Sequence, residues 1–355
     1  MRFLICLGLS SLFALTCTAR IRAHRNALYV LAALLALGTG CGAALGLEAL
    51  LPPAVELVLW RPLARGSLAT ALFALVMYAG ALPDGSPVRR KLLSIRGELS
   101  ILAGLLTLGH NLAAGQVYFV RLVTAPGSLP RNQLLAALCS LVLLALLLPL
   151  LVTSFPAVRR RMPGRRWKQL QRLAYLFYGL TYVHVVLLFL PDAREGSVSA
   201  LVNLAVFSAV FLGYAALRLR KALGRSRLRP VPAAAALLLF ALVVLPALPR
   251  SDGGQDPADP ADPGVRWQDG VYTGKGRGYG GPVQAEVTVS EDRITGVRIT
   301  DHREDEPYWK KAQVTIPRIL EAQTPSVDTV AGATKSCKGI QRAVRDALKQ
   351  AERGR

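Results

Sequence analysis

The first 250 residues contain uninterrupted apolar runs, each near the ~20 residues that an α-helix needs to cross a bilayer. These runs lie at 27–51, 66–83, 98–120, 134–155, 173–191, 198–217 and 231–249. The chain is 52% apolar and only 18% charged, below the roughly 25% charge of ordinary globular proteins. The expected fold class is a multi-pass α-helical membrane bundle. Residues 3–19 are either an eighth span or a signal peptide, so seven to eight spans are expected.

The net charge of +21 belongs entirely to this apolar part. Residues 1–250 contain 27 Lys and Arg against 6 Asp and Glu, whereas residues 251–355 contain 16 of each. The basic residues lie in short loops between apolar runs and do not form one soluble face, which argues against a nucleic-acid partner. The expected surroundings of this part are membrane lipid.

The distribution of Lys and Arg predicts the orientation, because basic loops stay on the cytoplasmic side of a membrane. One alternating set of loops, at 20–26, 84–97, 157–172 and 218–230, holds 20 basic residues. The other set, at 52–65, 121–133 and 192–197, holds 5. The first set is therefore expected in the cytoplasm of a bacterial cell, with the protein in the cytoplasmic membrane and the chain from residue 250 onward extracytoplasmic.

The tail predicts a small separate domain. We expect a transmembrane domain at 1–249, an Asp- and Pro-rich linker at 250–266 and an α+β domain at 267–355. Alternating apolar residues at 283–289 and 297–299, with a turn at Glu291 and Asp292, predict an antiparallel hairpin. A helix is expected at 309–322 despite Pro317, a residue that is better tolerated in the first turn of a helix. The terminal helix has one apolar stripe, formed by Ile340, Ala343, Val344, Ala347 and Leu348.

Two histidines fall inside the apolar runs. His110 and His184 each lie 12 residues from the cytoplasmic landmarks Glu98 and Arg172, which predicts the same depth for both, about 18 Å from the inner end. Ionisable side chains in hydrocarbon are costly and mark a pathway or a cofactor. Two imidazoles at one depth are the axial ligands of a six-coordinate b haem, and they also suit a proton relay in a transporter.

The segments around these histidines resemble a known family. Two segments resemble the third and fifth helices of the ferric-reductase-like transmembrane family. They are IRGELSILAGLLTLGHNL (95–112) and RRWKQLQRLAYLFYGLTYVHVV (165–186). The similarity covers roughly residues 60–220. It implies that His110 and His184 ligate haem iron. Many members have two histidines on each helix and two haems, whereas this chain has one on each, so the resemblance implies one haem b.

A threonine precedes the terminal helix in DTVAGATKSCKGI. Gly332 and the small Ala333 allow a tight turn, and Thr334 and Ser336 stand at the beginning of the helix. Unpaired N–H groups and the positive end of the helix dipole favour a phosphate there. The simpler interpretation is an N-cap, the common role of Thr or Ser before a helix.

The same motif resembles the flavinylation motif of the FMN-binding domain in subunits of the sodium-translocating NADH:quinone oxidoreductase. The similarity covers about residues 267–351 and includes DGVYTGKGRGYGG and ITDHRED. It implies that a flavin transferase joins FMN through its phosphate to Thr334 and that Asp328 is needed for the reaction. The sequence departs from the family at Ala331, where Ser or Thr is usual, and at Asp305, where Thr usually follows the glutamate.

These features together predict an electron-transfer protein, a component of an oxidoreductase system rather than a self-contained enzyme. It would pass electrons between a membrane donor, a quinol or another redox protein, and an extracytoplasmic acceptor. Two other classes remain open. One is a transporter that uses the two histidines as a proton pair, and the other is a membrane-anchored sensor or assembly factor whose flavin domain is vestigial.

Overall fold

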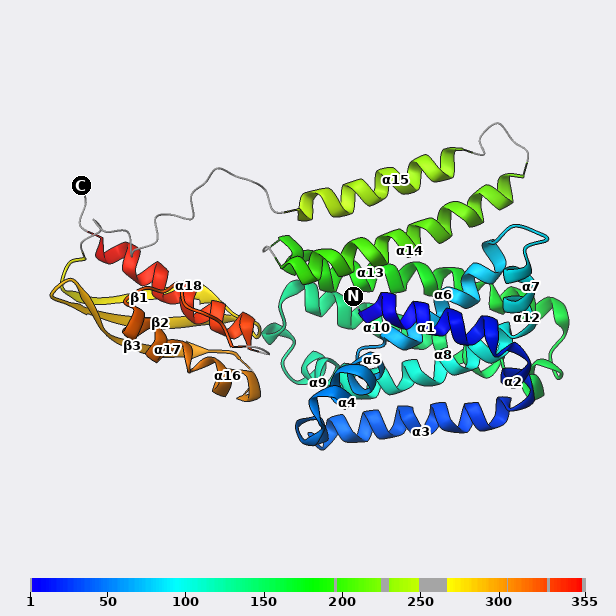
Figure 1. The fold of residues 1–355 in the computed structure, drawn as a ribbon, viewed down its shortest axis with the longest axis horizontal. Coiled ribbons are helices and arrows are strands. Elements are labelled where there is room, and N and C mark those ends of the chain that lie inside the picture. Colours follow the sequence, from blue (N-terminus) through cyan, green and yellow to red (C-terminus); the bar gives the residue numbers. More distant parts are fainter. Residues whose placement is uncertain are drawn as a thin grey trace. The chain divides into compact units, whose positions relative to one another are not determined.

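The computed structural model describes residues 2–194, 197–224, 230–248, 267–304, 306–330 and 333–352. The chain divides into two compact units, Met1–Pro249 and Arg250–Arg355. The first unit is helical and the second contains a three-stranded sheet (Figure 1). The expected linker at 250–266 lies outside the described residues.

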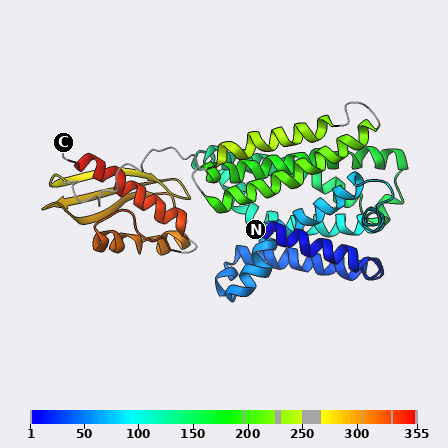
Figure 2. The same ribbon diagram turned by 45° about the horizontal axis from the view of Figure 1, so that its top comes forward.

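A helix lies in each of the seven predicted runs of the first unit, and the long helices run side by side (Figures 1 and 2). The longer helices are α1 (Arg2–Thr16), α3 (Arg25–Ala44), α6 (Ser67–Ala81), α8 (Arg96–His110), α9 (Gln116–Thr124), α10 (Arg131–Val152), α13 (Leu173–Arg194), α14 (Val198–Leu223) and α15 (Val231–Val244). The shorter ones are α2 (Thr18–Ala23), α4 (Pro53–Val55), α5 (Arg61–Ala64), α7 (Pro87–Ser94), α11 (Pro156–Arg159) and α12 (Gly164–Gln171). Short 3-10 or π segments are η1 (Leu47–Leu50), η2 (Glu56–Trp60), η3 (Asn111–Gly115), η4 (Pro126–Ser128) and η5 (Leu245–Ala247).

The lengths of these helices indicate a membrane protein. Within the described ranges, 4 helices are long and apolar enough to cross a bilayer, and the number rises to 6 if each of two bent pairs is one span. The bent pairs are Pro53–Ala64 with Ser67–Ala81, at 52°, and Pro87–Ser94 with Arg96–Thr124, at 62°. Two further apolar helices, Arg2–Thr16 and Val231–Ala247, are shorter. Apolar side chains such as Leu34 and Leu237, 62% and 71% exposed, suit a surface covered by lipid.

The first helix is part of the core of this unit. Phe3 is 1% exposed, and its ring stacks on the ring of Phe207 with 4.1 Å between centroids. Cys6 and Ala14 on the same helix are also buried. The apolar face of α1 therefore packs into the bundle, mainly against α6.

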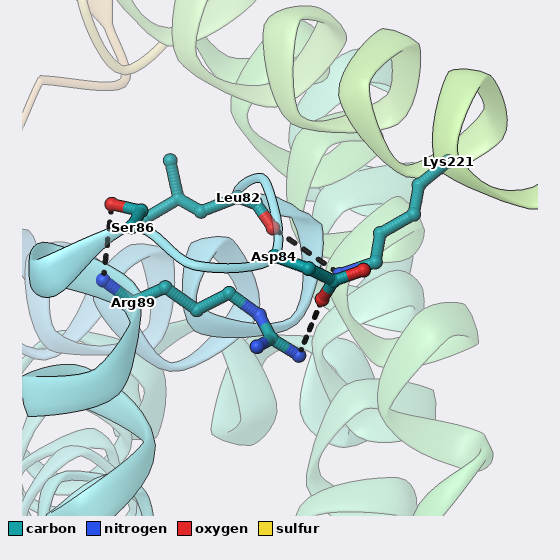
Figure 3. Close-up of polar contacts among 5 residues, drawn as sticks. All are labelled: Leu82, Asp84, Ser86, Arg89 and Lys221. Carbon is teal, nitrogen blue, oxygen red and sulfur yellow. Dashed lines mark hydrogen bonds and ion pairs between the residues drawn. The ribbon is translucent and has the colours of Figure 1, made fainter.

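An ionic contact joins two of the basic segments. Asp84, in the loop between α6 and α7, accepts from Lys221 Nζ at 2.9 Å and lies 3.1 Å from Arg89 Nη2, and Lys221 also donates to the carbonyl of Leu82 (Figure 3). The hydrogen bond from Lys221, with the charges of Lys221 and Arg89, lowers the pKa of Asp84. Its contribution to stability is therefore present at neutral pH and is lost as the pH falls through that lowered value. The contact joins the loop at Asp84 to the end of α14 at Lys221, and both residues belong to the segments expected on one side of a membrane.

The second unit is an antiparallel sheet covered by helices. Strands β1 (Gly270–Arg277), β2 (Pro282–Ser290) and β3 (Arg293–His302) follow one another in the order β1-β2-β3. Helix α18 (Thr334–Ala351) packs on β1 and β2, and α17 (Thr315–Ala322) contacts β3 (Figure 1). The predicted hairpin is confirmed, with Glu291 and Asp292 in the left-handed conformation at its turn. The five residues of the predicted stripe on α18 are all 0% exposed.

Two glycines explain how α18 reaches the sheet. A Cβ atom at Gly274 would overlap the backbone of Ala343 and Ala347, and one at Gly276 would overlap the carbonyl of Gly339. The helix backbone therefore lies directly on β1, and larger residues at these positions would force the two apart. The GKGRGYGG segment is thus a strand and turn of this sheet.

The helix expected at 309–322 is two helices, which corrects that prediction. Helix α16 (Glu306–Ala312) ends before Gln313, and α17 begins at Thr315. Proline has no N–H, so Pro317 cannot bond the carbonyl four residues before it; the carbonyl of Gln313 accepts instead from the N–H of Ile316 at 3.0 Å. Pro317 falls in the first turn of α17, where proline is tolerated.

Candidate functional site

Thr334 is the first residue of α18, and its side chain is exposed. The residue that precedes the helix is Ala333, which is buried and has no side-chain oxygen, so Thr334 is not the N-cap. Within the described part of the chain, the Thr334 hydroxyl makes no hydrogen bond. An exposed hydroxyl beside the free N–H groups of an 18-residue helix is suitably placed to carry a phosphate ester. Gly332 of the motif lies outside the described residues.

Ser336 is held inside the domain by a buried carboxylate. Its hydroxyl donates to Glu304 Oε2, and the other carboxylate oxygen accepts from the N–H of Gly280 at 2.7 Å. Ser336 and Glu304 are 1% and 7% exposed. Glu304 therefore ties the beginning of α18 to the β1–β2 turn, and Ser336 positions the helix rather than offering a second free hydroxyl. The sequence carried only one signal of this role, an acidic residue directly after β3.

Removal of this carboxylate should destabilise the C-terminal unit. We expect Glu304→Ala to lower its free energy of unfolding by about 3 kcal/mol, because the buried hydroxyl of Ser336 and the half-buried N–H of Gly280 lose a charged acceptor. Hydrogen exchange of the β1–β3 amides, measured in the full-length protein, gives the change. The matched control is Glu286→Ala, which removes an exposed ion pair with Arg298 and should cost less than about 1 kcal/mol. Equal effects of the two substitutions would contradict the role of Glu304.

Asp328 lies on a segment that folds back along α18. Gln341 Nε2 donates to the carbonyl of Val327 at 2.6 Å, and the N–H of Val330 lies 3.5 Å from Cys337 Sγ. The backbone carbonyl of Asp328 accepts from Arg318 at 2.9 Å, whereas its side chain is exposed. Contacts on both sides therefore hold the Asp328 backbone beside the first turns of α18, and its carboxylate stays accessible to solvent.

A groove with an aromatic wall lies on the same unit. The rings of His302 and Trp309 stack at 3.8 Å with an interplanar angle of 19°. The groove has a volume of about 460 Å³. It is lined by Val297, Arg298, Ile299, His302, Trp309, Gln313, Ile316 and Pro317. A flat, largely apolar ring system suits such a wall. Glu304 follows His302 by two residues, and its side chain accepts from the hydroxyl of Ser336, two residues after Thr334. These residues fit an FMN joined to Thr334.

The two membrane histidines each have one ring nitrogen fixed by the protein. His110 Nδ1 donates to the carbonyl of Ala64 at 2.7 Å, and its ring lies against Gly66, which has a left-handed φ of +69°. His184 Nδ1 lies 3.2 Å from both the carbonyl of Ala136 and the hydroxyl of Ser140. With Nδ1 as the donor, the Nε2 lone pair of each ring is free to bind a metal.

The two histidines come from different helices, His110 from α8 and His184 from α13. Neither Nε2 atom makes a hydrogen bond within the described ranges. A neutral imidazole whose Nδ1 is bonded to a carbonyl is the usual form of a metal-ligating histidine, so the donor set fits the axial ligands of a haem.

Comparison with known proteins identifies the C-terminal unit. Residues 278–349 match the FMN-binding domain family. A stretch of 85 residues is 33% identical to the NADH:acrylate oxidoreductase of Vibrio harveyi and covers 24% of this chain but only 8% of that protein. The chain therefore carries an FMN-binding domain at its C-terminus, and part of the chain is related to an NADH:acrylate oxidoreductase.

A second relative covers both units. An uncharacterized protein of Treponema pallidum (strain Nichols) is 38% identical over 304 residues, which are 82% of this chain and 84% of that protein. No solved structure matches the chain. A match over 82% of the chain extends into both units.

Proposed function

We propose, from the premise that the chain belongs to the same family as the Treponema pallidum protein, that it is an electron-transfer flavocytochrome of the bacterial cytoplasmic membrane. The C-terminal FMN-binding domain supports a role in flavin-based electron transfer.

The flavin is joined to Thr334 by a phosphoester that a flavin transferase forms. The observation that carries this proposal is the exposed, unbonded hydroxyl of Thr334 at the beginning of α18. Asp328 is accessible on the adjacent segment and serves the modification reaction. A covalent bond has a physical advantage outside the cytoplasm, because a dissociated flavin would be lost to the surroundings.

One b haem is held between His110 and His184. The Nδ1 atoms of the two rings are held by Ala64 in one case and by Ala136 and Ser140 in the other. The Nε2 lone pair on each ring is then left to bind the iron. When bound, the haem supplies one-electron transfer and the FMN supplies two-electron transfer. The protein's part is to fix the ligand rings, exclude water and hold the attachment residue.

The helical unit spans the membrane seven or eight times, with the bent pairs and the short apolar helices included. The basic loops face the cytoplasm and the FMN-binding domain is extracytoplasmic, in accord with the count of 20 against 5 basic residues. A quinol is the electron donor; its oxidation to quinone releases two electrons and two protons. An extracytoplasmic protein, metal ion or small molecule accepts the electrons.

Reduction by quinol tests the proposal. The full-length protein, coexpressed with a flavin transferase and purified without oxygen, is expected to contain one haem and one covalent FMN per chain. Addition of a reduced naphthoquinone with one isoprenoid unit should shift the haem absorption to its ferrous form and bleach the flavin band.

Other outcomes favour other functions. A colourless protein whose transport activity depends on pH would overturn the proposal in favour of a transporter with a histidine proton pair. A protein that binds its partners without flavin would overturn it in favour of a sensor or assembly factor.

A further inference from the structure

His302, the last residue of β3, lines the groove of the second unit because of a β-bulge. In the ladder between β2 and β3, His302 pairs with Val283 and Ile299 pairs with Ala285. These partners are two residues apart on β2 but three apart on β3, so β3 carries one extra residue at this point. Without it, Ile299 and His302 would lie on opposite faces of the sheet. The bulge places both in the wall of the groove, and such bulges are common next to functional sites.

The backbone decides which nitrogen of the His302 ring carries the proton. The N–H of Glu304 donates to His302 Nδ1 at 3.3 Å. A backbone N–H can only donate, so Nδ1 accepts through its lone pair. In a neutral imidazole the proton then lies on Nε2. His302 therefore presents an N–H donor at Nε2.

This donor is fixed in direction and open to a ligand. The ring of Trp309 covers one face of the imidazole, and the bond from Glu304 to Nδ1 fixes the rotation of the ring. Within the described residues Nε2 makes no hydrogen bond, and it is not sealed from solvent. A fixed donor in the wall of a largely apolar groove is the kind of polar group that orients a bound molecule.

Glu304 connects this donor to the helix that carries the attachment residue. Its backbone N–H bonds His302, and its carboxylate accepts from the hydroxyl of Ser336. Ser336 lies two residues after Thr334, in the first turn of α18. Because one residue contacts both elements, the wall of the groove is next to the end of α18 that carries Thr334.

The rest of the wall suits the apolar part of a ring system. Half of the residues that line the groove are aliphatic or proline: Val297, Ile299, Ile316 and Pro317. The charged residue of the wall, Arg298, pairs with Glu286 at 3.0 Å. A ligand for this groove therefore has a flat apolar body and an acceptor atom at its edge. The ring of a flavin has both, a dimethylbenzene part and a pyrimidine part with carbonyl oxygens.

We infer that the flavin ring of the FMN lies in this groove and that His302 donates a hydrogen bond from Nε2 to one of its carbonyl oxygens. The attachment of this FMN to Thr334 rests on the proposed function. The bulge, the position of the proton on His302 and the groove do not depend on that attachment.

The hydrogen bond has a consequence for the reduction potential of the flavin. Electrons taken up from the proposed quinol increase the electron density on the pyrimidine part of the ring. A donor to that part therefore stabilises the reduced flavin more than the oxidised flavin. Loss of the donor should lower the reduction potential.

Two substitutions at one position separate the donor from the packing of the ring. His302→Phe keeps a flat ring beside Trp309 but removes both nitrogens. His302→Gln restores a donor, because its side-chain amide N–H can replace Nε2–H. The control is Ile299→Val, which shortens a side chain of the same wall without changing a donor. Flavin fluorescence on a denaturing gel shows which full-length variants, coexpressed with a flavin transferase, are folded and modified.

The measurements are a potentiometric titration of the flavin, with the haem spectrum subtracted, and the infrared spectrum of the oxidised flavin. We expect His302→Phe to lower the equilibrium constant of flavin reduction about tenfold, which is ~30 mV for a two-electron couple. The carbonyl band of the flavin should move to higher frequency in the same variant. His302→Gln should restore most of both quantities, and Ile299→Val should change neither.

An unchanged potential and an unchanged carbonyl band in His302→Phe would overturn the inference. Equal losses of potential in His302→Phe and His302→Gln, with the band unmoved, would also overturn it, because packing and not a donor would then set the potential. An unsubstituted protein without covalent flavin would instead contradict the proposed attachment. Titration of free FMN into the same variants then decides the role of His302: a Kd raised about tenfold in His302→Phe but not in His302→Gln supports it, and equal Kd values refute it.

Discussion

Thr334→Ala is expected to abolish covalent flavin attachment completely. The substitution removes the only side-chain atom of Thr334 that can form a phosphoester, and the next hydroxyl, that of Ser336, is buried and donates to Glu304. The full-length protein, coexpressed with a flavin transferase, should lose all flavin fluorescence from its band on a denaturing gel. Mass spectrometry should show the loss of one added FMN.

The control for this experiment is Thr329→Ala, which removes a threonine hydroxyl five residues earlier and should leave the fluorescence unchanged. Asp328→Asn keeps the size of the side chain but removes its charge, and should reduce the yield of flavinylated protein without changing the fold. A Thr334→Ala protein that keeps its covalent flavin would show that the attachment residue lies elsewhere.

His110→Ala and His184→Ala should each eliminate the low-spin haem spectrum. The proposed haem would need both imidazoles, each as a ligand through the Nε2 atom that makes no hydrogen bond within the described residues. Absorption spectra of the purified full-length variants give the result, and pyridine extraction counts the haem that remains. The expected loss of the low-spin bands is complete in either variant.

His24→Ala is the control, because His24 is exposed in the basic loop between α2 and α3. Its haem content and spectrum should equal those of the unsubstituted protein. Thermal melting of the variants without haem distinguishes a lost ligand from a lost fold. A low-spin spectrum that survives in either His110→Ala or His184→Ala would refute axial ligation by this pair.

Several features of the candidate site could be predicted because they depend on nearby residues. The position of Thr334 at the beginning of a helix follows from the stripe that starts at Ile340, and the structure places it there. The shared depth of His110 and His184 stays a prediction. Their Nδ1 partners, Ala64 and Ala136, could not be predicted, because those carbonyls belong to other helices. Glu304 was noted only as part of a motif, and its contact with Ser336 spans 32 residues.

The sequence by itself determined the apolar helices, the hairpin and the buried face of α18, because length and periodicity are properties of short stretches of chain. Only the tertiary structure decided that β1 is a strand, since its glycines have no side chains to form an alternating pattern and are needed where α18 lies on the sheet. It also decided the break between α16 and α17. Close approach and burial depend on residues that are distant in the chain, and no local pattern contains them.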